Sequence, residues 1–409
     1  MLLPLLALAA APITLASPLY ARQTGAYPPA LQKGPTPKQE WVATYNAAKA
    51  AGKIPSFPSA TLVGGNPTYP SGTNTGENGV CSWTVSHCFG DNDISDAPDG
   101  MYAIAFDDGP LPSSVNLYNF LKQQNQTATH FLIGTNIVNN PDVFKLALSI
   151  GGHLAVHTWS HPYMSTLTDM QVLGELGWTA QAIYDQSGGL VPKYWRPPYG
   201  DTDDRVRAIA EEVFGLTLVA WNRDSNDWCL NSGPGACPSY GPQSQADLES
   251  ELKGWMAGSK SPGPCGLEHE SGPETVGAFI NTYPGIKQHG WDARCIPDLF
   301  DADWYQNAAR NGTPVPVPAA SAIGHGPVSL VVSASSSSVA LNSTSAASTA
   351  TAPVTTSRLS TASAVISSTS PSAAAQSAKS KATSAAPAGA LIGSSVALIA
   401  VVCGATLLA

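Results

Sequence analysis

The chain has 409 residues, of which 34 are proline, 37 are glycine and only 12% are charged. Lysine and arginine total 20 against 29 aspartate and glutamate, a formal net charge of −9. This balance argues against nucleic acid as a partner and favours neutral or cationic polymers. The length allows one or two domains, but so little charge predicts that much of the chain lies outside a folded core.

Both ends of the chain carry apolar segments typical of export. Residues 1–17 read MLLPLLALAAAPITLAS and predict a cleaved signal peptide, with a short buried helix as the alternative. Residues 388–409 are mainly apolar up to the last residue and predict a GPI-attachment signal, which the cell removes. A transmembrane helix is the alternative there, because the segment is about long enough to span a bilayer. We therefore expect a secreted protein at the cell surface, anchored through a GPI lipid to the outer face of the plasma membrane and the cell wall.

Two further segments differ in composition from a folded domain. Residues 326–387 are rich in Ser, Thr and Ala without any helical or strand period, and predict a disordered, glycosylated stalk. Residues 18–94 form a Pro- and Gly-rich extension whose role the sequence does not reveal. N-glycosylation sequons at Asn125, Asn311 and Asn342 agree with secretion.

Cysteine usage indicates an oxidising compartment. Of the 7 cysteines, Cys403 lies in the segment expected to be removed. The other candidates for disulfides are Cys81, Cys88, Cys229, Cys237, Cys265 and Cys295. An even number in an exported chain predicts three disulfides, and the absence of any C-x2-C pair disfavours a metal-thiolate cluster. Cys229 and Cys237 are close enough to close one loop, and the other pairings stay open.

The middle of the chain alternates short apolar runs with helix-like stretches. The strand candidates are residues 102–106, 129–133, 152–156, 194–195 and 216–221, with a further one near Leu267. The helix candidates are residues 113–124, 141–150, 168–187 and 203–214. This alternation predicts an α/β fold with a parallel sheet covered by helices. Polar clusters follow the strands repeatedly, which is typical of a barrel with its chemistry at the carboxyl ends of the strands.

The polar clusters offer a base and a metal site. Asp107 and Asp108 are adjacent, so one carboxylate can bind a metal while the other acts as general base toward water. His157 and His161 are spaced i, i+4 and can present both imidazoles to one metal. With Asp108 they would form a set of two imidazoles and one carboxylate that leaves positions open for water and substrate. We expect one divalent ion, Zn²⁺ first, with Co²⁺ or Mn²⁺ satisfying the same ligands.

Two later clusters supply supporting groups. Arg196 could hold Asp107 ionised, and the two prolines that follow it would fix the backbone N–H of Tyr199 as an oxyanion donor. His269 could act as general acid with its imidazole paired to Asp227. Two more candidates would contact the substrate, with Leu267 as an apolar wall and Trp228 as a platform for a sugar ring.

In chain order, FDDGP, HTxxH, RxPY, DxxDW and LxH resemble the motifs of the polysaccharide deacetylases, carbohydrate esterase family four. The resemblance covers roughly residues 96–300, about half the chain, and predicts a catalytic domain at residues 95–305. It implies a distorted (β/α) barrel, here with flanking disordered regions. It implies these roles: Asp107 the base; Asp108, His157 and His161 the metal ligands; Arg196 the residue that orients the base; Tyr199 an oxyanion donor and substrate contact; Asp227 the partner of the acid; His269 the acid. Ala105 stands where Thr is usual, and Gly266 interrupts the apolar approach to the last motif.

The export features make the chain similar to the cell-wall chitin deacetylases of fungi. That similarity implies metal-dependent N-deacetylation of N-acetylglucosamine units in chitin, giving chitosan and acetate. The expected partners are chitin, N-acetylglucosamine oligomers and other cell-wall glycans. An acetylated polysaccharide such as acetylxylan and a non-catalytic glycan-binding role are the alternatives. A glycosidase is disfavoured, because its two carboxylates must stand about 5–9 Å apart across a sugar, whereas Asp107 and Asp108 are sequence neighbours.

Overall fold

The computed structural model describes residues 27–231, 237, 240–310 and 312–328. The predicted signal peptide, Asn311, Asn342, Cys403, the GPI-attachment segment and all but the first three residues of the predicted stalk lie outside the described residues. Within the described ranges, no helix is both long enough and apolar enough to cross a membrane.

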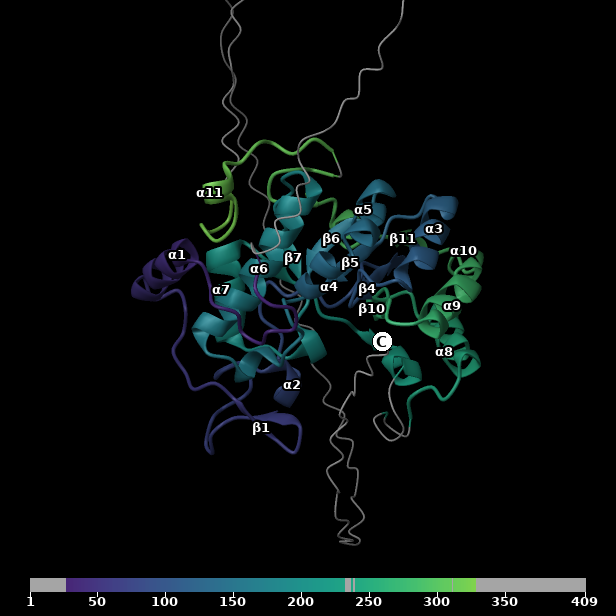
Figure 1. The fold of residues 1–409 in the computed structure, drawn as a ribbon. Helices are drawn as coiled ribbons and strands as arrows, with labels where there is room; N and C mark the ends of the chain where they lie inside the picture. The colour runs from purple at the N-terminus through teal and green to yellow at the C-terminus, as the bar shows by residue number, and fades with distance from the viewer. Residues whose placement is uncertain (1–26, 232–236, 238–239, 311, 329–409) are drawn as a thin grey trace, which may run out of the picture. The chain divides into compact units, whose positions relative to one another are not determined.

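Five short parallel strands form the main sheet (Figure 1). They pair in chain order: β4 (Ala105–Asp107), β5 (Thr129–Leu132), β6 (His153–Val156), β7 (Tyr194–Trp195) and β8 (Thr217–Leu218). The first three are buried along their whole length, so each appears in the sequence as a continuous run rather than an alternating one. The register places Ala105, Thr129 and His153 side by side. The strand candidates 129–133, 152–156 and 194–195 are confirmed. The candidate 102–106 is divided between β3 (Met101–Ala103) and β4, and the expected strand 216–221 is shorter.

Two further pairings close this sheet into a distorted barrel. β9 (Arg223–Asp224) continues the chain from β8 and pairs in parallel with β10 (Gly266–Leu267). The segment that contains β10 then reaches the opposite edge of the sheet, because Asp107 of β4 and His269 form a parallel bridge. The strands therefore form a ring, which confirms the expected α/β barrel.

Helices surround the barrel (Figure 1). They are α1 (Gln39–Ala50), α2 (Trp83–Ser86), α3 (Ser114–Gln124), α4 (Gly134–Asn139), α5 (Pro141–Ser149), α6 (Asp169–Ser187), α7 (Asp204–Phe214), α8 (Gln245–Ala257), α9 (Pro273–Thr282), α10 (Pro284–Gln288) and α11 (Ala319–Ala322). Short 3-10 turns lie at Met164–Thr166, Pro198–Gly200, Asp227–Asn231 and Pro297–Phe300. The remaining strands are β1 (Thr61–Val63), β2 (Asn66–Thr68), β3 (Met101–Ala103) and β11 (Asp292–Arg294).

Local sequence explains where α6 and α7 begin and end. α6 begins at a capping box in which the Thr168 hydroxyl accepts from the backbone N–H of Gln171. α7 begins after Asp203, whose carboxylate accepts from the N–H of Val206, and ends at Gly215 with φ 64°. These bounds confirm the expected helices 168–187 and 203–214.

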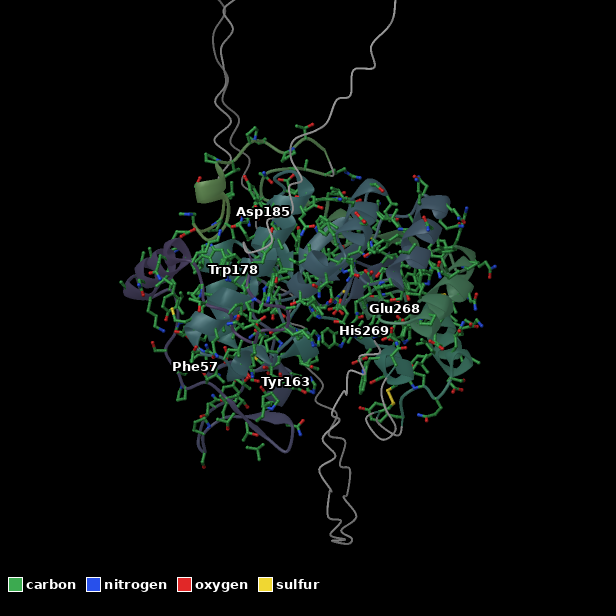
Figure 2. All side chains as sticks on the ribbon, viewed as in Figure 1. Phe57, Tyr163, Trp178, Asp185, Glu268 and His269 are labelled. Carbon is green, nitrogen blue, oxygen red and sulfur yellow. A yellow bond between two sulfur atoms is a disulfide. The ribbon has the colours of Figure 1, made fainter. Side chains whose placement is uncertain are left out.

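The N-terminal extension packs on the barrel from residue 27 onward. Its helix α1 lies against α6 and α7, and the Trp41 side chain is completely buried. The Trp41 indole lies edge-on to Trp178, which Figure 2 labels, and to Phe214. Its Nε1–H donates to the carbonyl of Ile323, 3.0 Å away. A large part of the N-terminal extension, for which the sequence revealed no role, is thus part of the folded domain.

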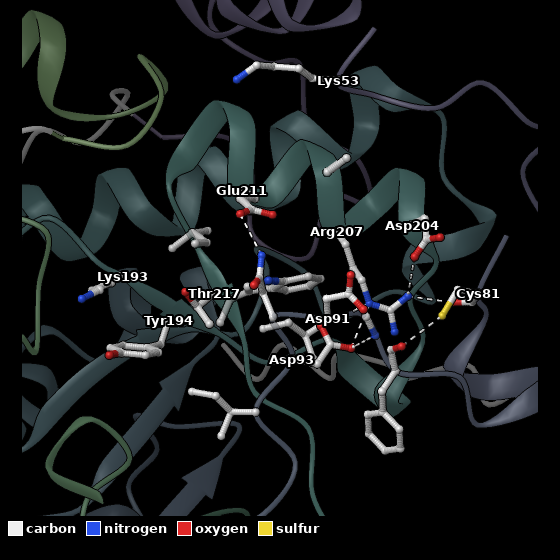
Figure 3. A pocket seen from close by; sticks show the side chains of 18 of the residues that line it. Lys53, Cys81, Asp91, Asp93, Lys193, Tyr194, Asp204, Arg207, Glu211 and Thr217 are labelled. Atoms are coloured by element: carbon white, nitrogen blue, oxygen red, sulfur yellow. Dashed lines mark hydrogen bonds and ion pairs between the residues drawn. The ribbon is translucent and has the colours of Figure 1, made fainter. Parts of the chain in front are cut away.

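A cleft of about 1020 Å³ opens at the side of α7 (Figure 3). Its walls include Asp93, Lys193, Arg207 and Glu211, and none of the residues that line it belongs to the predicted catalytic set. The chemistry considered below therefore lies elsewhere on the barrel.

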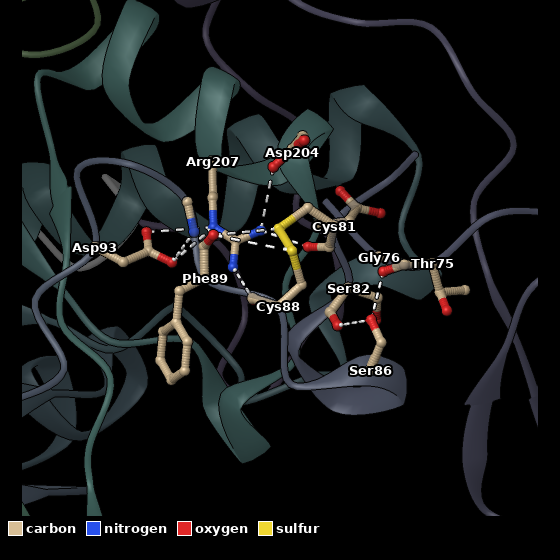
Figure 4. Close-up of a disulfide and its surroundings, with 12 residues drawn as sticks. Thr75, Gly76, Cys81, Ser82, Ser86, Cys88, Phe89, Asp93, Asp204 and Arg207 are labelled. Carbon is tan, nitrogen blue, oxygen red and sulfur yellow. Dashed lines mark hydrogen bonds and ion pairs between the residues drawn. A yellow bond between two sulfur atoms is a disulfide. The ribbon is translucent and has the colours of Figure 1, made fainter. Parts of the chain in front are cut away.

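Arg207 also anchors the first disulfide, Cys81–Cys88 (Figure 4). Its guanidinium donates to the backbone carbonyls of both cysteines and forms an ion pair with Asp93. The second disulfide joins Cys229 to Cys237, the loop closure that the sequence suggested.

The expected third disulfide is not formed, because Cys265 and Cys295 are both free and buried. Ala103 of β3 pairs in parallel with Arg294 of β11 on one side and forms a bridge with Cys265 on the other. The two cysteine-bearing segments are therefore about two strand spacings, roughly 10 Å, apart. A disulfide requires Cα atoms within about 7 Å, so the prediction of three bridges was wrong.

We expect Cys265 and Cys295 to resist thiol reagents in the native protein and to react after unfolding without reductant. Burial raises the pKa of Cys265 to about 11 and that of Cys295 to about 12, so little thiolate forms at neutral pH. Peptide mapping after alkylation measures this, with Cys81 and Cys88 as controls that react only after reduction. A peptide in which Cys265 and Cys295 are cross-linked would contradict the assignment.

Candidate active site

The side chains predicted to do chemistry gather at the carboxyl ends of adjacent strands. Asp107 is the last residue of β4, His157 follows β6, Arg196 follows β7, and His269 lies just beyond β10. Because these strands are parallel and neighbouring, their ends meet at one end of the barrel. The structure thus brings together groups from distant parts of the chain.

Asp108, His157 and His161 form a candidate metal centre. Each residue offers one ligand atom, and the three atoms lie within 4.8 Å of one another. Asp108 Oδ1 is 3.5 Å from His157 Nε2 and 3.4 Å from His161 Nε2. That oxygen is buried and has no hydrogen-bond partner among the described residues. A carboxylate oxygen left unsatisfied between two imidazole nitrogens fits a bound divalent cation, which would supply the missing partner.

The backbone around these ligands adopts conformations that most residues avoid. Asp108, Thr158 and His161 have φ values of 72°, 64° and 59°. Such left-handed conformations cost about 1–3 kcal/mol for a non-glycine residue and persist where the surrounding structure holds them. Here they turn both ligand-bearing loops toward one point.

Hydrogen bonding and burial prepare the two imidazoles for a metal. His157 Nδ1 lies 2.8 Å from the carbonyl oxygen of Arg196, which can only accept, so Nδ1 carries the proton and Nε2 presents its lone pair. Burial lowers the pKa of His161 to about 4, against the attraction of Asp108, so this imidazole is neutral at neutral pH. Neutral imidazoles are the form that binds metals.

Asp107 is held by a completely buried arginine. Arg196 Nη1 donates to Asp107 Oδ1 at 2.8 Å, and the other guanidinium nitrogens donate to backbone carbonyls of the β8–β9 connection. The guanidinium also lies 4.3 Å from the ring centroid of Phe131. Asp107 Oδ2 keeps its lone pairs and lies 3.7 Å from His157 Nε2. The carboxylate is therefore oriented by one oxygen and available as a base through the other.

Asp227 contacts His269 through both carboxylate oxygens. Oδ2 accepts from the backbone N–H of His269 at 2.7 Å, and Oδ1 lies 2.6 Å from its Nδ1. Burial alone would lower the pKa of His269. The charge and hydrogen bond of Asp227, with smaller contributions from Asp107 and Asp108, outweigh burial and raise this pKa to about 10. His269 is thus an imidazolium at neutral pH, although a cation beside Asp108 would offset part of this rise.

The three remaining candidates lie around this centre. Tyr199 has φ 58° after its two prolines, and its half-exposed ring stacks on Tyr163 with centroids 4.1 Å apart. The same ring lies edge-on to His161 at 4.6 Å. Leu267 is buried in β10, and Trp228 is partly buried beside Asp227. Tyr163 and His269 are labelled in Figure 2 and show where this region lies in the molecule.

The sequence analysis did not identify two residues of this region. Tyr163 forms the stacking partner of Tyr199, and no pattern marked it. Glu175 on α6 accepts hydrogen bonds from the loop that carries His157 and His161. An acidic residue between apolar neighbours in a long helix is a signal that the sequence offers. The sequence does not show which groups Glu175 accepts hydrogen bonds from.

The chain is similar in sequence to several known proteins. Residues 95–219 match the family model for polysaccharide deacetylases. Chitin deacetylase 3 of Cryptococcus neoformans var. neoformans serotype D is 44% identical over 243 residues, covering 59% of this chain and 58% of that protein. The chitin deacetylase of Amylomyces rouxii is 38% identical over 206 residues, covering 49% and 48%. A family 4 carbohydrate esterase from Streptomyces lividans, solved with acetate, is 28% identical, with TM-score 0.41 and coverage of 54% of this chain and 100% of that one.

Residues 95–219, which include the five strands of the main sheet, therefore resemble the polysaccharide deacetylases. The chain resembles the fungal chitin deacetylases, as its motifs implied, and it spans less than two thirds of the length of these two curated relatives.

Replacing Asp227 by Asn should lower the pKa of His269 by about 1–3 units, because the variant removes the charge that stabilises the imidazolium. Nitrogen-15 NMR titration of the His269 ring measures this directly. Asp292→Asn, on an exposed strand end that does not contact His269, is the control and should leave the titration unchanged. An unchanged pKa in Asp227→Asn would mean that Asp227 only holds the backbone.

Proposed function

We propose that this domain removes N-acetyl groups from N-acetylglucosamine units of chitin, releasing acetate and leaving chitosan. The observation that carries the proposal is the Asp108 oxygen left unsatisfied between two imidazoles, beside a carboxylate and an imidazolium at one barrel end. The names of the curated relatives, chitin deacetylases, support chitin as the substrate.

The chain's own residues divide the proton transfers between them. Asp107, oriented by Arg196 through Oδ1, takes a proton from the attacking water through Oδ2. His269 donates a proton from Nε2 to the leaving amine, because Nδ1 is engaged by Asp227. The backbone N–H of Tyr199 is proposed to donate to the developing oxyanion. Leu267 and Trp228 are proposed to form the walls around the acetyl group and the sugar.

Asp108, His157 and His161 would hold one divalent metal, which supplies Lewis acidity for the amide carbonyl and for water when it is bound. Two imidazoles and a carboxylate suit Zn²⁺, the ion we propose, although Co²⁺ and Mn²⁺ accept the same ligands.

The two alternative functions require different parts of this site. A non-catalytic glycan-binding protein would require neither the unsatisfied Asp108 oxygen nor a charged His269. Another acetylated polysaccharide such as acetylxylan would need the same reacting groups, so comparing acetate release from the two polymers separates these substrates.

Asp107→Asn should lower acetate release from chitin oligomers by about 10²–10⁴-fold and leave the metal content near one equivalent, because the amide can be oriented but cannot take a proton. His157→Ala should lose both activity and metal. Acetate assay and elemental analysis of the purified variants measure the two properties.

Two results would contradict these roles. Full activity after exhaustive chelation would exclude a metal-dependent reaction. If Asp107→Asn lost the metal and Asp108→Asn kept it, the roles within the pair would be reversed.

We also propose that the protein is anchored by a GPI lipid, because the apolar segment 388–409 follows a Ser/Thr-rich stalk. Treating intact cells with a phosphatidylinositol-specific phospholipase should release the protein into the medium. A sample without the phospholipase is the control. Retention in the membrane fraction, together with a retained tag fused after Ala409, would instead indicate a transmembrane tail.

A further inference from the structure

Glu175 is a completely buried carboxylate that takes no part in the proposed chemistry. Its Oε2 accepts from the backbone N–H groups of Trp159 and Ser160, both at 2.8 Å. Its Oε1 accepts from the Ser160 hydroxyl at 2.7 Å and from the backbone N–H of Gly34, also at 2.7 Å. All four partners can donate here, so the ionised carboxylate, which only accepts, matches them.

The Glu175 donors lie between the two imidazole ligands. Trp159 and Ser160 are in the middle of the five-residue loop that begins at His157 and ends at His161. From the other side, the N–H of Gly134 donates to the carbonyl of Thr158, 2.9 Å away. The loop is therefore held from α6 and from the start of α4, so the separation of the ligands depends on both contacts.

The fourth donor belongs to the N-terminal extension. Residues 29–35, here called the N-terminal strap, contact this loop directly at Trp159 and indirectly through Glu175 and Thr135. Besides the bond from Gly34 to Glu175, the N–H of Leu31 donates to Thr135 Oγ1 at 3.1 Å. The Trp159 indole N–H donates to the carbonyl of Pro29 at 3.1 Å.

Glycines allow the N-terminal strap to pass this close to α6. A Cβ atom on Gly174, the residue before Glu175, would overlap the carbonyl oxygen of Pro35. Gly34 has φ 58°, a conformation that L side chains rarely adopt. The matched family segment begins only at residue 95, so this support comes from outside it.

We propose that Glu175 is a positioning residue of the metal centre and that, with the N-terminal strap, it sets the geometry of His157 and His161. Metal affinity depends on how closely the ligands are held in the bound arrangement, and the loss of outer hydrogen bonds to a ligand set typically costs 10–100-fold in affinity. The inference rests on the proposed function only in requiring that the site binds a metal.

The central test is the zinc affinity of Glu175→Gln, measured by competition with a chromophoric chelator. The amide has one accepting oxygen, so its NH₂ group must face at least one N–H donor of the loop or of the N-terminal strap. We expect zinc binding to weaken about 10–100-fold. Glu212→Gln on α7, which loses only an exposed ion pair with Lys53, is the matched control and should bind zinc as the unmodified protein does.

Two milder variants keep the test valid if Glu175→Gln does not fold. Ser160→Ala removes one donor to Glu175, and Thr135→Val removes the hydroxyl that links Leu31 to the carbonyl of Trp159. Each should weaken zinc binding by a few-fold, and the absorption bands of the Co²⁺-loaded variants should shift because the ligand geometry changes.

The outcomes separate this inference from the proposed function. Folded variants with unchanged zinc affinity and unchanged Co²⁺ spectra, differing only in melting temperature, would overturn the positioning role while leaving the proposed function intact. An unmodified protein that bound neither zinc nor cobalt would overturn the metal centre and the proposed function together.

Discussion

The parallel bridge between Asp107 and His269 is the contact on which the site depends. The N–H of Asp107 donates to the carbonyl of Glu268 at 2.9 Å, and the N–H of Glu270 donates to the carbonyl of Asp107 at 3.0 Å. These two bonds join the segment of the last barrel strand to β4 and so complete the ring. The same bonds bring the proposed base and the proposed acid beside each other, although they lie far apart in the chain. Barrel closure and assembly of the site are therefore one structural event.

Around that bridge, buried charges are matched by partners. Arg196 neutralises Asp107, Asp227 binds His269, and Glu175 satisfies the peptide groups of the ligand loop. Removing one partner from such a buried pair typically costs 3–5 kcal/mol, because the other charge is left uncompensated. These contacts also offset the strained backbone of Asp108 and His161. Asp108 Oδ1 and Glu270 Oε2 are exceptions within the described residues, and of these two Asp108 Oδ1 is the one that lies between two imidazole nitrogens, at the candidate metal centre.

Much of the fold could be predicted because its information is local. The longer strands of the main sheet lie within short, mainly apolar runs, and α6 and α7 carry recognisable capping residues at their starts. The expected strand 216–221 was only partly right, since β8 ends at Leu218 and Val219 forms a bridge with Ile94 instead. Ile94 belongs to the N-terminal extension, and no periodic pattern in the sequence predicted how that extension packs.

The sequence by itself determined which candidate reacting groups the protein has and in what order they occur, because acids, histidines and arginine stand in short motifs directly after apolar strands. Only the tertiary structure decided how distant segments meet. Cys265 and Cys295 cannot pair because β3 lies between the segments that carry them. The number of cysteines in a sequence gives no information about this separation. Glu175 and Gly34 meet at the ligand loop because α6 and the N-terminal extension pack against each other there. Their hydrogen bonds join residues without any fixed spacing along the chain, so only the folded backbone specifies them.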